Sequence, residues 1–165
     1  MVQQNPFSRR KRVSGQKEYG PCEWASLVRK SQQEMDMIQG KNTTTIYVIT
    51  PSKERLSQKA DLTRLSNTLQ LVPNLHWILV EDRKNKSKMI AEFLKKSCLL
   101  QYTHLAVPKN STIVKGKGML QRNAAMDFLR EKYQNDSVED LNGVIYFADD
   151  DNAYDVRLFT DYIRN

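Results

Sequence analysis

Apolar and polar residues alternate in blocks along most of this chain, and the blocks predict strands and helices in turn. Four runs rich in apolar and β-branched residues predict buried strands, at residues 44–50, 75–82, 102–108 and 143–151. Helical spacing predicts a helix after each strand, at residues 58–72, 87–98, 119–133 and 153–163. This order predicts an α/β fold, a mostly parallel sheet with alternating helices on both faces.

The predicted helices each carry an apolar stripe that would face the sheet. The stripes consist of Leu62, Leu65, Leu69 and Val72 in the first helix, Met89, Phe93 and Leu94 in the second, and Leu120, Ala124, Phe128 and Leu129 in the third. Residues 1–42 differ, because they are polar, basic and rich in glutamine. We interpret residues 1–42 as a tail or stem with a short helix at about residues 24–38, and residues 43–165 as the domain.

The net charge of +7 narrows the choice of partners. Much of the excess lies in residues 8–12 and 82–88. It suits a polyanion, an anionic membrane surface or a phosphate-bearing ligand, or it reflects only a solvated basic face. We expect no nucleic-acid partner, because the cations are scattered rather than gathered in a groove with aromatic platforms.

Signals of cellular compartment disagree. No apolar run reaches the roughly 18–20 residues that span a bilayer, and the first residues lack the apolar segment of a signal peptide. Taken literally, these two features indicate the cytosol. Four N-x-S/T sequons hint instead at a secretory lumen. They begin at Asn42, Asn85, Asn110 and Asn135.

Neither the cysteines nor the histidines form a metal-binding or catalytic pattern. We expect no disulfide framework, with Cys98 buried in a helix and Cys22 either free or bonded to another chain. His76 and His104 fall inside predicted strands, without a serine or cysteine partner at a telling position. We interpret both as core histidines.

The candidate site lies beyond the carboxyl ends of the strands, where parallel sheets bind ligands. The fourth predicted strand ends in Asp149, Asp150 and Asp151. Carboxylates this close repel, and a hard divalent cation neutralises them well. Mg²⁺ and Mn²⁺ use one or two protein carboxylates when a diphosphate supplies other oxygens, so the run predicts a metal-bridged nucleotide. Capping of the helix expected near Asp155 is the alternative.

Basic residues at the start of the third predicted helix fit the same site. Lys115, Lys117 and Arg122 flank two glycines there, which can form a clamp for a diphosphate or merely an exposed basic loop. Asp82 ends the second predicted strand and could accept a hydrogen bond from a base or a sugar hydroxyl, or be a surface residue. The chain has no Walker motif and no G-x-G-x-x-G after the first strand.

Several segments occur together in one known family. They are "TPSKERLSQKADLTRLSNTLQLVPNLHWILVED", "YTHLAVP", "KGMLQRNAAMDFLRE" and "GVIYFADDDNAY", in this order from about Thr44 to the C-terminus. These segments resemble the animal β-1,3-glucuronosyltransferases. The resemblance implies a Rossmann-like, GT-A-type fold and Mn²⁺ dependence. It also implies an inverting transfer of glucuronic acid from UDP-glucuronate to a terminal galactose, on the proteoglycan linkage region or on glycoprotein glycans.

The resemblance also implies a role for six residues. It implies that Asp82 contacts the uracil and that Asp150 contacts the ribose. Lys117 and Arg122 would bind the nucleotide, and Asp149 would lie beside the donor sugar and Arg122. Asp151 would ligate the Mn²⁺. One departure stands in the same region, because Lys53 follows "TPS" where the family usually has an aromatic residue. The segment before "QRN" is also shorter than is usual in the family.

The resemblance covers only part of the family's length. We therefore expect a truncated donor-binding half, with the acceptor-binding half, the general base and the membrane anchor outside this chain. Such a half would not catalyse transfer alone, and a UDP-binding module without activity is the alternative function. By resemblance we expect the lumenal side of the Golgi membrane and a possible homodimer.

Overall fold

Four parallel strands form the centre of the protein. The computed structural model describes residues 20–38, 44–108, 116, 118–134 and 142–163. The sheet has the order β3-β2-β1-β4. Its strands are β1 (Thr45–Ser52), β2 (Leu75–Glu81), β3 (Gln101–Ala106) and β4 (Gly143–Phe147). The predicted α/β fold with a parallel sheet is confirmed.

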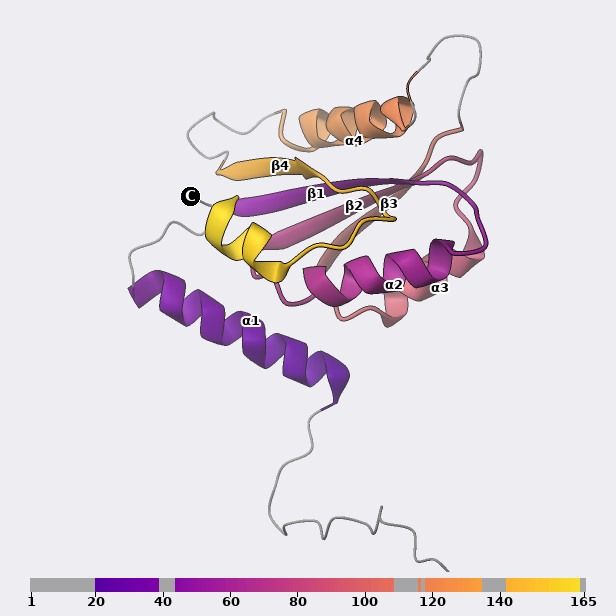
Figure 1. The fold of residues 1–165 in the computed structure, drawn as a ribbon. Helices are drawn as coiled ribbons and strands as arrows, with labels where there is room; N and C mark the ends of the chain where they lie inside the picture. Colours follow the sequence, from indigo (N-terminus) through magenta and orange to yellow (C-terminus); the bar gives the residue numbers. More distant parts are fainter. Residues whose placement is uncertain (1–19, 39–43, 109–115, 117, 135–141, 164–165) are drawn as a thin grey trace, which may run out of the picture.

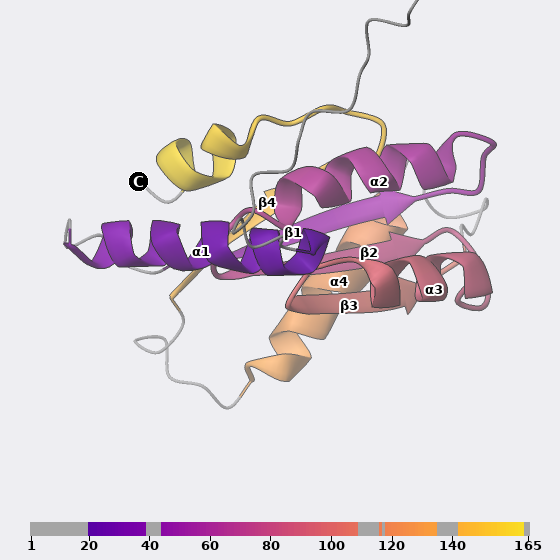
Figure 2. The same ribbon diagram turned by 90° about the horizontal axis from the view of Figure 1, so that it is seen from below.

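Helices cover both faces of this sheet. They are α1 (Pro21–Ile38), α2 (Gln58–Leu69), α3 (Lys88–Lys96), α4 (Met119–Lys132) and a short π-helical turn, η1 (Leu158–Tyr162). Figure 1 shows α4 on one face and α2 and α3 on the other. Seen from below in Figure 2, α1, α2 and α3 lie in front of the sheet. The helix expected at residues 24–38 therefore exists and begins a few residues earlier.

The two faces have separate apolar cores. On the α2 and α3 face, the predicted stripe of α2 is buried in full against Trp77 of β2. The stripes of the other two helices were predicted only in part. In α3, Leu94 is buried and Phe93 packs against the core as predicted, but Ile90 is buried in place of Met89, which is exposed. In α4, Leu129 is buried and Phe128 packs against the core as predicted, but Ala125 is buried in place of Ala124, a shift of one residue.

Gln121 gives a physical reason for the shift in α4. Its amide Nε2 donates to the carbonyl oxygen of Val107 at 2.9 Å, and the side chain is buried. A polar residue thus fixes which side of α4 faces the sheet. Hydrophobic periodicity cannot detect such a contact.

The end of β4 also differs from the prediction. The strand stops at Phe147, and the backbone turns at Asp150 and Asp151 instead of continuing as a strand to residue 151. The chain then packs back under β4, where Tyr146, Tyr154 and Phe159 form a cluster with ring centroids 5.6 to 6.1 Å apart. We attribute the early end of the strand to this return path.

Helix capping belongs to a different aspartate. The carboxylate of Asp155 accepts a hydrogen bond from the backbone N–H of Arg157 at 2.9 Å, where the last helical segment begins. Its side chain also pairs with the guanidinium of Arg157. The three aspartates at positions 149–151 therefore need another explanation than capping.

A disulfide fastens α1 to the amino end of the sheet, which overturns the expectation for the cysteines. Cys22 of α1 is bonded to Cys98, with their Cα atoms 4.9 Å apart. Cys98 lies beyond the last residue of α3 and is only partly buried. No short-range pattern predicts this pair, because 76 residues separate the two cysteines. None of the described helices is long and apolar enough to cross a bilayer.

His76 is buried, as predicted, whereas His104 is only partly buried. His76 shares a hydrogen bond of 2.8 Å between its Nε2 and the hydroxyl of Thr103. Burial, and secondarily the charge of Lys132, lowers the pKa of His76 to about 4. The Nε2 atom of His104 contacts the buried carboxylate of Glu81.

Candidate functional site

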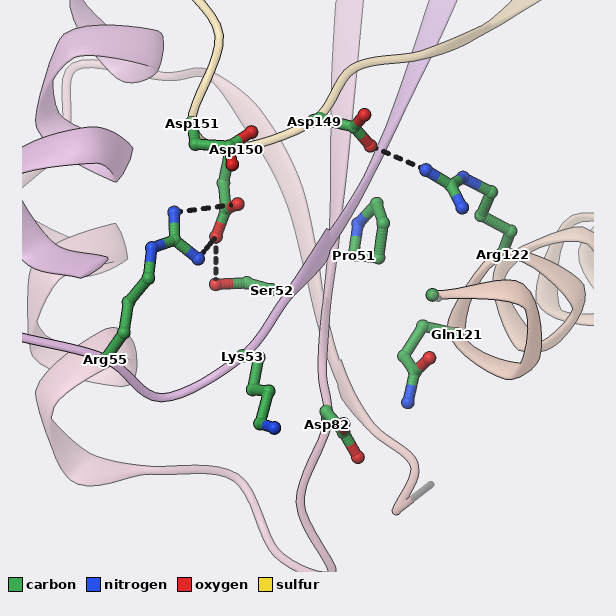
Figure 3. Close-up of a pocket in the computed structure, with 11 residues that line it drawn as sticks. Pro51, Ser52, Lys53, Arg55, Asp82, Gln121, Arg122, Asp149, Asp150 and Asp151 are labelled. Atoms are coloured by element: carbon green, nitrogen blue, oxygen red, sulfur yellow. Dashed lines mark hydrogen bonds and ion pairs between the residues drawn. The ribbon is translucent and has the colours of Figure 1, made fainter. Parts of the chain in front are cut away.

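A cleft of about 510 Å³ opens at the carboxyl edge of the sheet. The ends of β1 and β2, the start of α4 and the acidic turn after β4 surround it (Figure 3). Its lining residues are Pro51, Ser52, Lys53, Arg55, Asp82, Gly118, Gln121, Arg122, Asp149, Asp150 and Asp151. The structure thus brings together five of the six predicted site residues, Asp82, Arg122, Asp149, Asp150 and Asp151, from three separate segments. The sixth, Lys117, lies outside the described residues, as does Lys115.

Asp150 is the buried member of the acidic turn. Its Oδ2 accepts a hydrogen bond from the Ser52 hydroxyl at 2.6 Å and one from Arg55 Nη1 at 3.0 Å. Its Oδ1 lies 2.9 Å from Arg55 Nη2. Gln58 donates in turn to the Ser52 oxygen at 2.9 Å. Both oxygens of this carboxylate are therefore held, in the two-pronged geometry that makes arginine–carboxylate pairs strong and directional.

Asp149 points to the opposite side of the cleft. Its carboxylate pairs with Arg122 of α4 at 2.5 Å (Figure 3). Both partners remain partly exposed, at 29% for the Arg122 side chain and 51% for that of Asp149. This pair borders the open volume, so either member can exchange its partner for a ligand at low cost.

Gly118 explains how Arg122 reaches the cleft. It has a positive φ of 70°, a conformation that side chains disfavour. A Cβ atom at this position would lie 3.0 Å from Pro51 Cβ and 3.1 Å from Arg122 Nη1. The absence of a side chain therefore lets the start of α4 approach the end of β1. The predicted glycine-containing turn at this helix start is present.

Asp151 is the aspartate with the most open carboxylate. It is exposed, and among the described residues its carboxylate has no hydrogen-bond or ion-pair partner. Its backbone carbonyl accepts a hydrogen bond from Arg64 Nη2 at 2.9 Å, which ties the turn to α2. Within the described ranges no group of three or more His, Cys, Asp or Glu side chains could hold a metal ion alone. One free carboxylate suits a Mg²⁺- or Mn²⁺-type ion that takes its other oxygens from a diphosphate and water.

Asp82 and Lys53 close the lower side of the cleft in Figure 3. The backbone N–H of Asp82 donates to the Ser52 carbonyl at 2.8 Å, so the ends of β1 and β2 stay paired up to the cleft. Lys53 is exposed on the same wall. A cation thus stands where we expected the family to place an aromatic ring.

Three polar residues of this cleft were assigned no role from the sequence: Ser52, Arg55 and Gln121. Ser52 and Arg55 could have been found, because they follow the carboxyl end of the first predicted strand, where ligands of parallel sheets bind. Gln121 gave no signal of this kind, because it lies within an otherwise ordinary helical pattern.

Comparison with known proteins decides the family. The sequence model that describes glycosyltransferase family 43 matches residues 65–165, and this range includes the whole acidic turn. The chain belongs to glycosyltransferase family 43. The expectation drawn from the motifs is thereby confirmed.

Curated relatives in family 43 carry enzyme names. Galactosylgalactosylxylosylprotein 3-beta-glucuronosyltransferase 3 of Mus musculus is 47% identical over 130 residues, which cover 70% of this chain and 38% of the relative. Galactosylgalactosylxylosylprotein 3-beta-glucuronosyltransferase 2 of Mus musculus is 46% identical, and the enzyme numbered 1 in the same series, from Homo sapiens, is 45% identical. Each match covers 70% of this chain and 36% of the relative. The chain spans less than two fifths of the length of these relatives.

Proposed function

We propose that this protein binds UDP-glucuronate in the cleft, as the donor-binding part of a β-1,3-glucuronosyltransferase. The observation that supports the proposal is that the three carboxylates of the acidic turn lie in three different environments. Asp150 is fixed in the wall, Asp149 faces a cation, and Asp151 is left open. Three consecutive carboxylates in three environments can serve three parts of one nucleotide sugar, and membership of family 43 supports a sugar donor.

Each cleft residue then has a distinct task. Asp82 accepts a hydrogen bond from the uracil, and Asp150 accepts one from a ribose hydroxyl. Arg122 exchanges part of its contact with Asp149 for a phosphate oxygen, which suits the planar fork of its guanidinium. Asp149 is left beside the donor sugar.

A divalent metal fits this arrangement through Asp151. Bound there together with the diphosphate, Mn²⁺ would offset the negative charge on the departing UDP. Asp151 is suited to hold it because its carboxylate is exposed and lies at the edge of the same cleft. Lys117 would add a further positive charge near the phosphates.

The acceptor side of the reaction is proposed only by chemical class. Inverting transfer needs a base that takes the proton from the acceptor hydroxyl as it attacks the sugar. We assign that base to no described residue. The acceptor we propose is a galactose-terminated glycan, such as that of the proteoglycan linkage region.

We further propose that the protein works in the lumen of the Golgi apparatus, attached to the membrane through an anchor outside this chain. The Cys22–Cys98 disulfide supports an oxidising compartment, since such bonds are rare where glutathione keeps thiols reduced. The sequon at Asn85 lies on an exposed residue, which is compatible with that compartment. A homodimer stays a prediction.

Calorimetric titration of UDP tests the proposal directly. We expect Mn²⁺-dependent binding by the unaltered protein, and a loss of about 10- to 100-fold in affinity for Asp151→Ala. Asp127→Ala is the matched control, because Asp127 is an exposed aspartate of α4 outside the cleft, and it should bind as the unaltered protein does. Equal binding with and without metal would contradict the role of Asp151, and no binding by folded protein would contradict the donor site.

Turnover separates this function from its alternative. The second candidate is a module that binds UDP without supporting transfer, because we assign neither the general base nor the acceptor site to a described residue. UDP release from UDP-glucuronate in the presence of a galactoside would exclude that candidate. UDP binding without any release would favour it.

A further inference from the structure

Asp61, in the first turn of α2, joins two arginines that the proposed function does not use. Its Oδ2 accepts hydrogen bonds from Arg55 Nη2 at 2.9 Å and from Arg55 Nε at 3.2 Å. Its Oδ1 accepts one from Arg64 Nη2 at 3.1 Å. Asp61 is buried at 8% exposure although it lies near the surface. One carboxylate therefore orients both guanidinium groups.

Each of these arginines reaches the acidic turn at a different atom. Arg55 binds both carboxylate oxygens of Asp150. Arg64 donates to the backbone carbonyl of Asp151 at 2.9 Å. The side chain of Asp150 is thus tied to Arg55, which lies just before α2, and the backbone of Asp151 is tied to Arg64 of α2.

Without Arg55, the burial of Asp150 would be unfavourable. Asp150 is 5% exposed, and its remaining contact would be the Ser52 hydroxyl. A buried carboxylate that loses its cation must protonate or move toward water. Either change would alter the position of the neighbouring Asp151, because the two residues share the turn.

We propose that Arg55, oriented by Asp61, is a positioning residue of the nucleotide site that holds the Asp150 carboxylate and, with Arg64, fixes the turn from which Asp151 faces the cleft. This inference rests on the proposed function, since it assumes that Asp150 and Asp151 serve a nucleotide. Arg55 and Asp61 would then support the side chains that bind the nucleotide and the metal ion. Residues that hold ligating carboxylates in this way strongly affect the affinity for the metal.

The charge states agree with this arrangement. The hydrogen bond to Asp150 is the main cause of a raised pKa for Arg55, and Asp61 adds to it. The Ser57 hydroxyl, followed by Arg55, lowers the pKa of Asp61. Both members of the positioning pair therefore stay ionised across the neutral range.

The test compares two replacements of Arg55 with a control variant on the neighbouring helix α2, using UDP and Mn²⁺ as the probe. Arg55→Gln should weaken UDP binding by about 10- to 100-fold. Arg55→Lys should recover only part of that loss, because a single ammonium group cannot bridge two carboxylates as a guanidinium does. Lys59→Gln removes a positive charge from an exposed site of α2 and should leave affinity unchanged.

A double-mutant cycle with Asp150→Asn distinguishes positioning from a general loss of structure. If Arg55 acts through Asp150, Arg55→Gln should have little further effect on UDP affinity in the Asp150→Asn background. Additive losses would overturn the inference, as would unchanged affinity in Arg55→Gln. Should Arg55→Gln fail to unfold cooperatively, the same cycle is run with Arg55→Lys and with Asp61→Asn.

The proposed function and this inference fail in different ways. Unaltered, folded protein that does not bind UDP overturns the donor site and the positioning role with it. Protein that binds UDP with Mn²⁺ but tolerates Arg55→Gln overturns only the positioning role.

Discussion

The two ends of the parallel sheet are stabilised by different kinds of contact. At the amino end, a disulfide joins Cys22 of α1 to Cys98, and Gln33 Nε2 of α1 donates to Asn74 Oδ1 at 2.9 Å. At the carboxyl end, described contacts across the cleft are hydrogen bonds and ion pairs on short connecting segments. The difference suggests that the first end maintains the fold, whereas the second can exchange its partners for a ligand.

Two arginines make the contrast concrete. Arg29 of α1 is buried and donates to the backbone carbonyls of Gln70 and Cys98, which carry no net charge, and burial lowers its pKa. Arg55 lies between Asp61 and Asp150, and the hydrogen bond to Asp150 raises its pKa. The same residue type thus fastens a helix at one end and holds charged groups at the other.

Breaking the disulfide should have the largest effect on stability. Replacing Cys22 with serine removes a crosslink between residues 76 positions apart, and such crosslinks are worth about 2–4 kcal/mol in the free energy of unfolding. UDP affinity should stay the same, because the cleft is at the opposite end. Denaturant unfolding and calorimetry on the same preparation measure both. Unchanged stability in Cys22→Ser, or a matching loss of UDP affinity, would contradict the separation of the two ends.

The sequence predicted the sheet better than it predicted the contacts between elements. The strands of a parallel sheet are buried on both faces, so their apolar runs are long and easy to detect. The α2 stripe was right at all four of its apolar positions, whereas the stripes predicted for α3 and α4 each missed a buried residue by one position, at Ile90 and at Ala125. The disulfide was missed because its cysteines meet only when α1 folds against a distant loop, and no local pattern records that approach.

The site was predictable where ligand chemistry repeats in the sequence. Three consecutive aspartates after an apolar strand are unusual, and Asp82 follows another such strand, so both were found. Arg55 was missed because a single arginine in a polar loop has many explanations. Only the fold, which brings Asp61 and Asp150 to either side of it, reveals what it contacts.

Acid should weaken the amino end through His76, with the next largest effect. Its pKa is about 4 in the folded protein against an ordinary value of 6.5. The unfolded chain therefore binds a proton between these values while the folded protein does not, so the free energy of unfolding falls as pH drops from about 6.5 to about 4. The expected loss is about 1–3 kcal/mol, and it is complete below the lower value.

Comparison with His76→Gln separates the effect of His76 on the free energy of unfolding from that of carboxylates, which titrate in a similar pH range. Thermal unfolding of both proteins between pH 7 and pH 4, in about half-unit steps, should give a shallower pH dependence for the variant. Parallel curves would mean that His76 does not supply the acid sensitivity.

The smallest effect on stability is expected at the ion pair across the cleft. Arg122→Ala should lower UDP affinity by about tenfold, the size of one lost charge-assisted contact of about 1.4 kcal/mol. It should change the free energy of unfolding by no more than about 1 kcal/mol, because the pair with Asp149 is partly exposed and the contact with the Phe147 ring, 5.9 Å from Arg122 Cζ, is weak.

Arg130→Ala is the matched control for Arg122→Ala, since Arg130 also lies on α4 and pairs with an exposed aspartate, Asp127, at 2.7 Å. It should have a similarly small effect on unfolding and none on UDP affinity. A loss of 2 kcal/mol or more in Arg122→Ala, well above the usual worth of about 0–1 kcal/mol for such pairs, would show that the carboxyl end also maintains the fold. The contrast between the two ends would then be one of degree, with Arg122 serving both stability and binding.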